Sequence, residues 1–533
     1  MSKLGLALSG GGFRAAFFHV GVLARLAELD RLREVEVIST VSGGSIVGAL
    51  YYLRLRVLLE EKEDDEITQE DYLELVRDVE RRLRQGVQKN IRARVFANLL
   101  KNVLMLSPWY SRSDRIGDLY DRHLYKKAWG KERKRKWKWF GPEKQIELRE
   151  LLIEPKGSKG FLPGRDNQGR KHKVPALVIN ATTLNSGHNW RFEAVRMGEA
   201  LPDDPVEGDL VRKVDKNMRL EQGYFTADSP SAPDDALQIP DSQVDFPLAL
   251  AVAASAAVPG VFHPLAISKL YDGIRVQLVD GGVQDNQGLQ ALEDQGCGRI
   301  VISDASGQMA DEEKPAAFAL TSLTRSGAIA TDRIRDMQLV HYRDERPDIV
   351  HLRMGLEPEC VPPLGNGRER PGKQDEQETA CGVNHGVQDR LSRIRTDLDY
   401  FSDTEALSLE MDGYLLAETA LEAQENGAGK DDRWPFLGLR TKLKEPDEAY
   451  LAELGAGHKK FLRAFRLRPT LATVVTLALL CPIVLLAFLA FRSPGWLRNR
   501  PWTAKAGALS LAAYLLFFVW SNLKPRMPWL YRR

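Results

Sequence analysis

The sequence predicts an α/β protein with a mostly parallel central sheet, followed by a pair of transmembrane helices. Short apolar stretches alternate with helical stretches through residues 3–59, and glycines stand at each strand-to-helix junction. Near the C-terminus, two long runs contain no charged residue. The first two observations favour parallel strands joined by helices. The third is typical of membrane-spanning segments.

The hydrophobic pattern predicts the N-terminal elements in order. They are a strand at Lys3–Leu8, a loop at Ser9–Gly12, a helix at Phe13–Leu29, a strand at Val35–Val41, a turn at Ser42–Gly44 and a helix from Ser45 to about Leu59. The strands are short apolar stretches, whereas the helices carry apolar residues three or four positions apart. Right-handed crossovers would place both glycine-rich turns at the carboxyl ends of adjacent strands, where α/β proteins bind ligands.

Beyond this unit, further elements alternate with polar stretches. Residues 60–170 form a highly charged insertion, and residues 201–243, rich in Pro and Asp, form a predicted loop. Further strands are expected at Val174–Asn180, Val276–Val279 and Ile300–Ser303, and helices at Leu248–Ala257 and residues 393–418. The chain is therefore divided into a main domain at 1–422, a linker and juxtamembrane segment at 423–466, and a transmembrane hairpin at 467–533.

The composition excludes several classes of protein. With 75 basic and 73 acidic residues, the net charge is +2, so no global field attracts nucleic acid. Hydrophobic residues make up 43% of the chain, which excludes wholesale disorder. The four cysteines form no CxxC motif, so neither a disulfide framework nor a zinc pattern is indicated. The N-terminus does not have the pattern of a signal peptide.

The two apolar runs are long enough to span a bilayer. Thr470–Phe491 and Ala506–Leu523 contain 22 and 18 residues. As helices they measure about 33 and 27 Å, against a hydrocarbon core of about 30 Å. The alternative is two buried core helices, which normally keep a polar stripe. Nine basic residues lie outside the pair and four lie in the connecting loop, so the main domain is expected in the cytoplasm.

The sequence STVSGGS at residues 39–45 lies at a predicted strand-to-helix turn. Such a turn exposes a hydroxyl at the start of a helix, which makes Ser42 a candidate nucleophile. Gly43 and Gly44 allow a sharp turn and the close approach of a carbonyl substrate. Only part of the usual G-x-S-x-G pattern is present, because Thr40 occupies the first glycine position. Alone, the motif also fits a plain turn.

Two other glycine-rich motifs complete the candidate site. SGGGFR at residues 9–14 presents backbone N–H groups before a helix, either as a phosphate-binding loop or as an oxyanion hole. No G-K-[ST] follows it, which argues against a nucleotide site. Arg14 would fix this loop or contact a phosphate headgroup. DGG at residues 280–282 follows an apolar strand, so Asp280 is either a turn residue or a carboxylate at the site.

Together the three motifs resemble the patatin-like phospholipase family. Residues 180–187 (NATTLNSG), 249–264 (ALAVAASAAVPGVFHP) and 393–418 are similar to the same family, so the resemblance covers about residues 4–420. It implies a three-layer α/β/α fold and a Ser–Asp dyad that needs no histidine. Thr40 departs from the commoner glycine of the family, which leaves the strain of the turn in question.

The resemblance also implies the roles of the site residues. Ser42 is the nucleophile and Asp280 the base. The oxyanion hole is assigned to Gly10, Gly11, Gly12, Arg14 and Gly43. A Ser–acid–His triad is the nearest competing site, with His341, His351 or His385 as its base. It is disfavoured because Ser42 follows two predicted strands, whereas in that fold the nucleophile follows about five.

A basic stretch with interleaved tryptophans, residues 126–138, suggests a second binding surface. It contains eight basic residues and one acid. It fits a solvated helix or loop, a surface for anionic lipid, or, less well, an RNA-binding segment.

The sequence thus predicts a membrane-anchored serine lipid acyl hydrolase of the phospholipase or lysophospholipase type. Its expected partner is membrane phospholipid or lysophospholipid, with no metal, no cofactor and no nucleic acid. The alternative is a catalytically idle or signal-regulated lipid-binding scaffold, which would not need all three motifs. The sequence indicates neither the headgroup nor the oligomeric state.

Overall fold

The computed structural model describes residues 2–91, 94–95, 112–130, 145–201, 211, 213–226, 236–307, 315, 318–345, 349–354, 378–422 and 431–458. These residues belong to one compact unit, Met1–His458. The two predicted membrane spans and the basic stretch after Gly130 lie outside the described residues. Within the described ranges, no helix is both long and apolar enough to cross a membrane.

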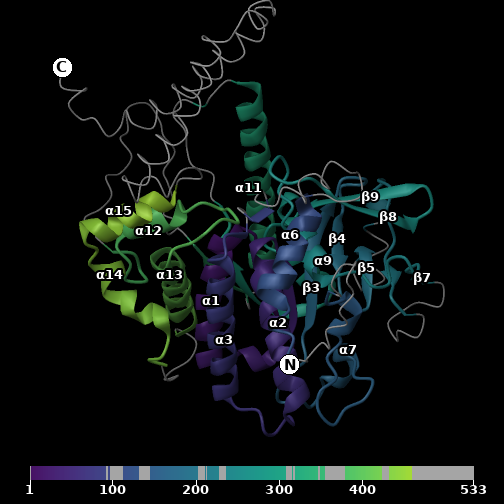
Figure 1. Ribbon diagram of the computed structural model, residues 1–533, viewed down its shortest axis with the longest axis horizontal. Coiled ribbons are helices and arrows are strands. Elements are labelled where there is room, and N and C mark those ends of the chain that lie inside the picture. The colour runs from purple at the N-terminus through teal and green to yellow at the C-terminus, as the bar shows by residue number, and fades with distance from the viewer. Residues whose placement is uncertain are drawn as a thin grey trace, which may run out of the picture. The chain divides into compact units, whose positions relative to one another are not determined.

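The N-terminal strands lie inside the sheet, away from both of its edges, and Figure 1 shows the arrangement of the described helices and strands. β1 (Lys3–Leu8) and β2 (Val35–Val41) have the predicted bounds, and nearly all their residues are buried. β1 pairs in parallel with β2 on one edge and with β10 (Cys297–Asp304) on the other. Strands that are covered on both faces bury both sets of alternate side chains, which explains their continuous apolar sequence.

The described strands form one 11-stranded mixed sheet in the order β11-β10-β1-β2-β3-β4-β5-β6-β7, with β9 pairing with β3 and β8 with β9. The remaining bounds are β3 Ala176–Thr183, β4 Asn189–Phe192, β5 Arg196–Glu199, β6 Gly223–Tyr224, β7 Leu237–Gln238, β8 Leu265–Tyr271, β9 Ile274–Asp280 and β11 Ile349–Arg353. The predicted mostly parallel sheet is therefore corrected to a mixed one. Parallel pairing runs from β11 to β3, and β4, β5 and β9 pair antiparallel. The connection between β3 and β4 is too short for the crossover that a parallel strand requires.

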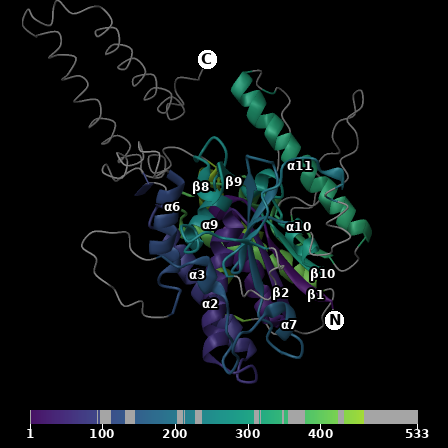
Figure 2. The ribbon, with the colours of Figure 1, turned by 90° about the vertical axis from the view of Figure 1, so that its right-hand side faces the viewer.

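Helices cover both faces of the sheet unequally. The bounds are α1 Gly12–Glu28, α2 Gly43–Glu61, α3 Gln69–Val87, α6 Arg112–Tyr120, α7 Pro163–Asp166, α9 Leu248–Ser255, α10 Leu289–Asp294, α11 Ala319–Glu345, α12 His385–Ser392, α13 Asp403–Glu422, α14 Arg440–Lys444 and α15 Glu448–Gly457. Figure 2 shows α2 and α3 on one side of the central strands and α10 and α11 on the other. The large core lies on the side of α1, α2, α3 and α13, and a smaller core forms under α10.

α1 and α13 cross with their backbones in direct contact. A Cβ on Gly21 would lie 1.8 Å from the carbonyl oxygen of Glu410, and a Cβ on Gly413 would lie 2.1 Å from that of Phe18. Neither position has room for a side chain. The crossing fixes α1, whose first residue belongs to the glycine-rich loop of the candidate site.

The predicted helix over residues 393–418 is corrected at its start. Residues 393–402 are not helical, and α13 begins only at Asp403. The Arg395 side chain bonds Asp399, Glu405 and the carbonyl of Tyr400, and these contacts stabilise a non-helical turn. This turn lies against the start of α1, where the amide of Phe13 donates to the carbonyl of Asp397 at 3.1 Å.

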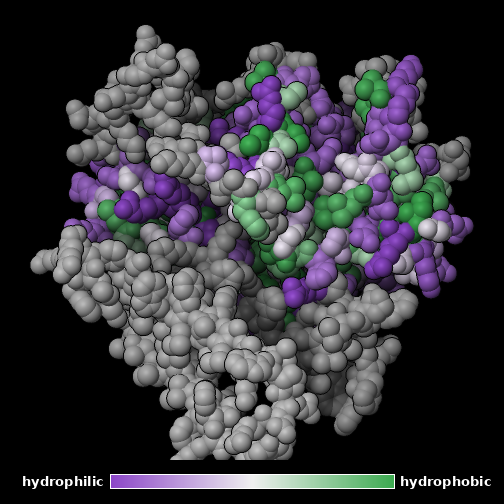
Figure 3. All heavy atoms as spheres, turned by 90° about the horizontal axis from the view of Figure 1, so that it is seen from above, coloured by the Kyte–Doolittle hydropathy of each residue, from purple (hydrophilic) through white to green (hydrophobic). Residues whose placement is uncertain are grey.

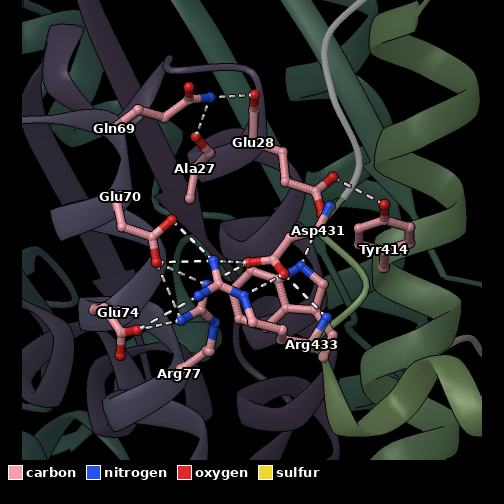
Figure 4. Close-up of polar contacts among 10 residues, drawn as sticks. Ala27, Glu28, Gln69, Glu70, Glu74, Arg77, Tyr414, Asp431 and Arg433 are labelled. Carbon is pink, nitrogen blue, oxygen red and sulfur yellow. Dashed lines mark hydrogen bonds and ion pairs between the residues drawn. The ribbon is translucent and has the colours of Figure 1, made fainter.

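Residues 431–458, within the segment assigned to the linker, pack on this unit through α14 and α15. A buried carboxylate, Glu28 of α1, accepts hydrogen bonds from the amide of Asp431, the indole of Trp434 and the hydroxyl of Tyr414 at 2.7–2.9 Å. Arg77 and Arg433 add ion pairs with Asp431 (Figure 4). The network therefore joins this segment to α1, α3 and α13.

Candidate active site

Ser42 lies in a strained turn between β2 and α2. Its backbone has φ 50° and ψ −113°, a region that residues with side chains seldom occupy, and only 5% of the residue is exposed. A Cβ on Gly43 would lie 2.0 Å from the carbonyl oxygen of Gly12, and one on Gly44 2.1 Å from that of Leu8. The two glycines after Ser42 therefore let α2 begin directly against the backbone of the glycine-rich loop.

The sheet register brings Asp280 to Ser42. Val41, the last residue of β2, pairs with Asn180 of β3, and Asp280 pairs with the next residue of β3, Ala181. β4 pairs with one edge of β3. On the opposite edge, β2 pairs with the first part of β3 and β9 pairs with the last part. The residue after Val41 and the last residue of β9 thus face each other, although they are distant in sequence.

Ser42 and Asp280 lie together in a buried setting. The Asp280 carboxylate accepts the amide of Gly282 at 2.8 Å, and the Ser42 side chain lies close enough to lower the pKa of this carboxyl. Burial outweighs both neighbours and raises the pKa of Asp280 to about 6. The Asp280 amide donates to the carbonyl of Ala257 at 3.0 Å, and its carbonyl accepts the hydroxyl of Thr182 at 3.1 Å. The carboxylate is therefore fixed in place and more basic than an ordinary aspartate.

The glycine-rich loop presents its amides beside this pair. Gly11 and Gly12 have φ of 143° and 60°, which is why glycine is required at both positions. The amide of Gly10 already donates to the carbonyl of Asn286 at 3.0 Å. Among the described residues, the amides of Gly11, Gly12 and Gly43 have no such partner. These three N–H groups are thus available to an anion at the site.

The Arg14 side chain, two residues after the glycine-rich loop, is held by backbone carbonyls of the protein. Its guanidinium donates to the carbonyls of Ala305, Ser392 and Ile394 at 2.7–3.1 Å. Burial lowers the pKa of Arg14 to about 10, although Asp304 opposes this. Of the five residues assigned to the oxyanion hole, Gly10 uses its amide and Arg14 the two terminal nitrogens of its guanidinium on the protein itself. The amides of Gly11, Gly12 and Gly43 have no acceptor among the described residues.

The histidines lie away from the hydroxyl of Ser42 in the described chain. His351 contacts Asp304 at 3.2 Å, and His341 lies 3.9 Å from Glu293. His19 is buried behind the glycine-rich loop, with Nε2 3.0 Å from the carbonyl of Ser9 and Nδ1 2.6 Å from the hydroxyl of Ser303. Burial lowers the pKa of His19 to about 4, so it is neutral and structural at physiological pH.

Sequence reasoning missed the groups that hold the site in place. Asn286 lies six residues after Asp280, and Ser255 lies in the quoted stretch ALAVAASAAVPGVFHP, but no role was assigned to either. Asn286 fixes Gly10, and the Ser255 hydroxyl accepts the amide of Ser42 at 2.9 Å. Their position inside a family-like stretch was the available signal. No group of three or more metal-ligating side chains occurs within the described ranges.

Hydrophobic side chains are exposed on the face viewed in Figure 3, among hydrophilic ones. The carbonyl of Ala257 accepts the amide of Asp280, and a loop begins at the next residue. Two residues of this loop, Val258 and Val261, are 39% and 51% exposed. Val283, three residues after Asp280, is 42% exposed. The candidate site is therefore bordered by apolar side chains.

The chain is similar to one known family and to several solved structures. The sequence profile of the patatin-like phospholipase family matches residues 6–292. Among solved structures, a human GIVD cytosolic phospholipase A2 in complex with methyl gamma-linolenyl fluorophosphonate has a TM-score of 0.38 at 13% identity, with 83% of this chain and 60% of that chain covered. VipD from Legionella pneumophila has a TM-score of 0.27 at 15% identity, with 79% of this chain and 67% of VipD covered. This chain thus spans less than two thirds of the human phospholipase structure. A search of curated proteins gave no match.

Proposed function

Because this chain belongs to the patatin-like phospholipase family, we propose that it is a membrane-anchored serine hydrolase that cleaves acyl esters of phospholipids or lysophospholipids. The observation that carries the proposal is the placement of Ser42 next to a buried, basic Asp280 by the sheet register, beside three unpaired amides of the described glycine-rich turns. A scaffold has no need for a strained serine with this partner.

In the proposed acylation step, Ser42 Oγ attacks the ester carbonyl carbon while the Asp280 carboxylate accepts its proton. The carbonyl oxygen becomes an oxyanion and accepts hydrogen bonds from the amides of Gly11, Gly12 and Gly43. When the intermediate collapses, the ester C–O bond breaks and the leaving alcohol takes the proton from Asp280. In deacylation, Asp280 takes a proton from water, the hydroxide attacks the acyl-enzyme, and Ser42 regains a proton as the fatty acid leaves.

Two features support a membrane as the site of action. The apolar runs at Thr470–Phe491 and Ala506–Leu523 have the length of membrane spans. The described part adds apolar side chains beside the site, and α11 exposes Leu323, Met337 and Val340. The proposed substrate is therefore a lipid within the bilayer, and neither nucleic acid nor a cofactor is invoked.

The catalytic proposal is tested by lipidomics. Membranes are incubated with the full chain or with Ser42→Ala, and released fatty acids and lysolipids are identified. We expect acyl products only from the wild type, and labelling of Ser42 by a fluorophosphonate that Ser42→Ala abolishes. Equal product release by Ser42→Ala would assign the nucleophile elsewhere, and no release by either would favour the scaffold.

The anchor is tested by deleting residues 467–533. We expect the truncated protein to leave the membrane fraction more completely than salt extraction achieves, because hydrophobic insertion is not screened by salt. It should still hydrolyse a soluble short-chain ester, since the matched family region ends at residue 292. A truncated protein that stays in the membrane fraction at high salt would show that the two runs are not the anchor.

A further inference from the structure

A chain of buried hydroxyls connects the backbone of Ser42 to the centre of the sheet. The amide of Ser42 donates to Ser255 Oγ at 2.9 Å, and Ser255 Oγ lies 2.8 Å from Ser45 Oγ. Ser45 Oγ lies 3.0 Å from Thr40 Oγ1, which lies 3.0 Å from the carbonyl oxygen of Val178 in β3. Thr40, Ser45 and Ser255 have no measurable exposure to solvent. The chain thus links β2, α2, α9 and β3.

The direction of every hydrogen bond in this chain follows from its two ends. The Val178 carbonyl can only accept, so the Thr40 hydroxyl donates its one proton to this carbonyl. Thr40 must therefore accept a hydrogen bond from Ser45. Ser45 has then used its own proton, so Ser255 donates to Ser45. Ser255 keeps its lone pairs for the amide of Ser42. All four hydrogen bonds point the same way, and each hydroxyl both donates and accepts.

The strained turn of Ser42 requires such support. A residue with φ of 50° and ψ of −113° persists only where its surroundings fix it. The Ser42 amide is buried and would otherwise lack an acceptor, so loss of Ser255 Oγ would favour rotation of the peptide group. That rotation would move Ser42 Oγ relative to both Asp280 and the glycine-rich loop.

Thr40 gives the chain its attachment to the sheet. The usual G-x-S-x-G pattern has glycine at this position, which has no hydroxyl and would end the chain at Ser45. The Thr40 side chain has room because residue 48 is glycine, where a Cβ would lie 2.5 Å from Thr40 Cγ2. The Thr40 methyl therefore fills the space at Gly48 while its hydroxyl joins Ser45 to β3.

We propose that Thr40, Ser45 and Ser255 are positioning residues that set the orientation of Ser42 through its backbone amide. They do not touch the substrate, so their removal should lower kcat and leave KM unchanged. This inference rests on the proposed function, in which Ser42 is the nucleophile. Displacement of a reacting atom by about 1 Å lowers rates by up to about 100-fold.

The decisive variants are a matched pair at Thr40 in the full chain. Thr40→Val keeps the shape and removes the hydroxyl, whereas Thr40→Ser keeps the hydroxyl and removes the methyl. We expect Thr40→Val to lower kcat on a soluble ester by about tenfold, whereas Thr40→Ser should keep most of the wild-type kcat. Ser255→Ala should lower kcat by about 10- to 100-fold. The double variant Thr40→Val/Ser255→Ala should be little worse than Ser255→Ala, because both interrupt one chain.

Ser408→Ala is the matched control. Ser408 is equally buried, bonds the carbonyl of Thr404 and the hydroxyl of Tyr450, and lies in α13. It should lower the melting temperature without changing kcat per active site. Rates are divided by the number of sites that a fluorophosphonate labels at completion, so that misfolded protein is not counted.

The outcomes separate the two proposals. If kcat per labelled site is unchanged in Thr40→Val and Ser255→Ala, or if Thr40→Val and Thr40→Ser lose kcat equally, the hydroxyl chain does not position Ser42. If instead the wild type has no esterase activity, or Ser42→Ala keeps it, the proposed function fails. Slower fluorophosphonate labelling in Thr40→Val than in Thr40→Ser would support the positioning role independently of turnover.

Discussion

The turn at Ser42 and the helix α11 differ in how their side chains are used. At the turn, Thr40, Ser45 and Ser255 are fully buried and hydrogen-bonded to one another. On α11, Leu323 and Val340 are 69% and 61% exposed. The first arrangement fixes a reactive atom against a rigid sheet. The second leaves apolar surface that gains stability only by contact with something outside the described unit.

The difference suggests a division of roles between the two regions. The turn lies at the end of a central strand, where every neighbour is supplied by the fold itself. Along α11, Arg335 and Leu339 face the body, as shown by the burial of Arg335 and the packing of Leu339 against the smaller core. In the proposed function, the turn performs the chemistry and α11 meets the lipid surface.

The largest expected effect concerns Asp280. Asp280→Asn should lower ester hydrolysis by about 1,000-fold or more, because the asparagine cannot accept the proton of Ser42. At pH 7 the same variant should be more stable than the wild type by up to about 3 kcal/mol, since it removes a buried charge whose pKa is raised from 3.8 to about 6. Both quantities come from kinetics and chemical unfolding of the purified protein.

Asp412→Asn provides the control for that variant. Asp412 in α13 is also buried, and burial raises its pKa to about 7, but it bonds Gln388 at 3.4 Å and not the site. It should gain stability in the same way and keep its activity. Near-normal turnover by Asp280→Asn would remove Asp280 from the proposed mechanism and leave the turn without a base.

The activity should also depend on pH through Asp280. The base must be ionised, so kcat/KM should fall about tenfold per pH unit below the pKa of about 6. Stability should change in the opposite direction. A carboxyl with a raised pKa binds its proton more tightly in the folded state, so the free energy of unfolding rises as the pH falls from about 6 towards 3.8.

The pH profile is measured on a soluble ester, and Asp412→Asn should have the same acidic limb. That control separates Asp280 from Asp412, a second buried carboxyl whose pKa burial raises to about 7. A wild-type profile that stays flat down to pH 5 would mean that no group with the raised pKa of Asp280 acts as the base.

The two regions also differ in how well the sequence predicts them. β1 and β2 have the predicted bounds because strands buried on both faces leave an unambiguous apolar pattern. Their glycine-rich junctions then locate the turns. The partner of Ser42 followed from a family resemblance, since pairing of Asp280 through β3 depends on long-range register that local periodicity does not encode.

Other features could not be read from local sequence at all. The bond from the Ser42 amide to Ser255 joins residues 213 positions apart, and the bond from Arg14 to Ile394 joins residues 380 apart. The turn at residues 393–402 was predicted as part of a helix, and only tertiary contacts, such as those of Arg395, select the turn. α11 was not predicted, and burial does not explain several of its apolar residues, since Leu323, Met337 and Val340 are exposed.

The smallest expected effect tests α11. The double variant Leu323→Glu/Met337→Glu places charges on two side chains that are 69% and 58% exposed, so the fold should tolerate it. Hydrolysis of lipid in anionic vesicles should fall about three- to tenfold, because a charged residue is costly to bring into a bilayer surface. Hydrolysis of a soluble ester should be unchanged, because neither side chain belongs to the site.

Val214→Glu is the matched control, since Val214 is 76% exposed and lies outside α11. It should change neither rate. Equal losses on vesicles and on the soluble ester would mean that α11 acts on the site and not on the lipid. No loss on vesicles would leave the apolar face for another occupant, such as a second copy of the chain, which the mass of the protein in solution would reveal. A loss confined to vesicles would establish that the chain separates the residues that perform the chemistry from those that meet the substrate's membrane.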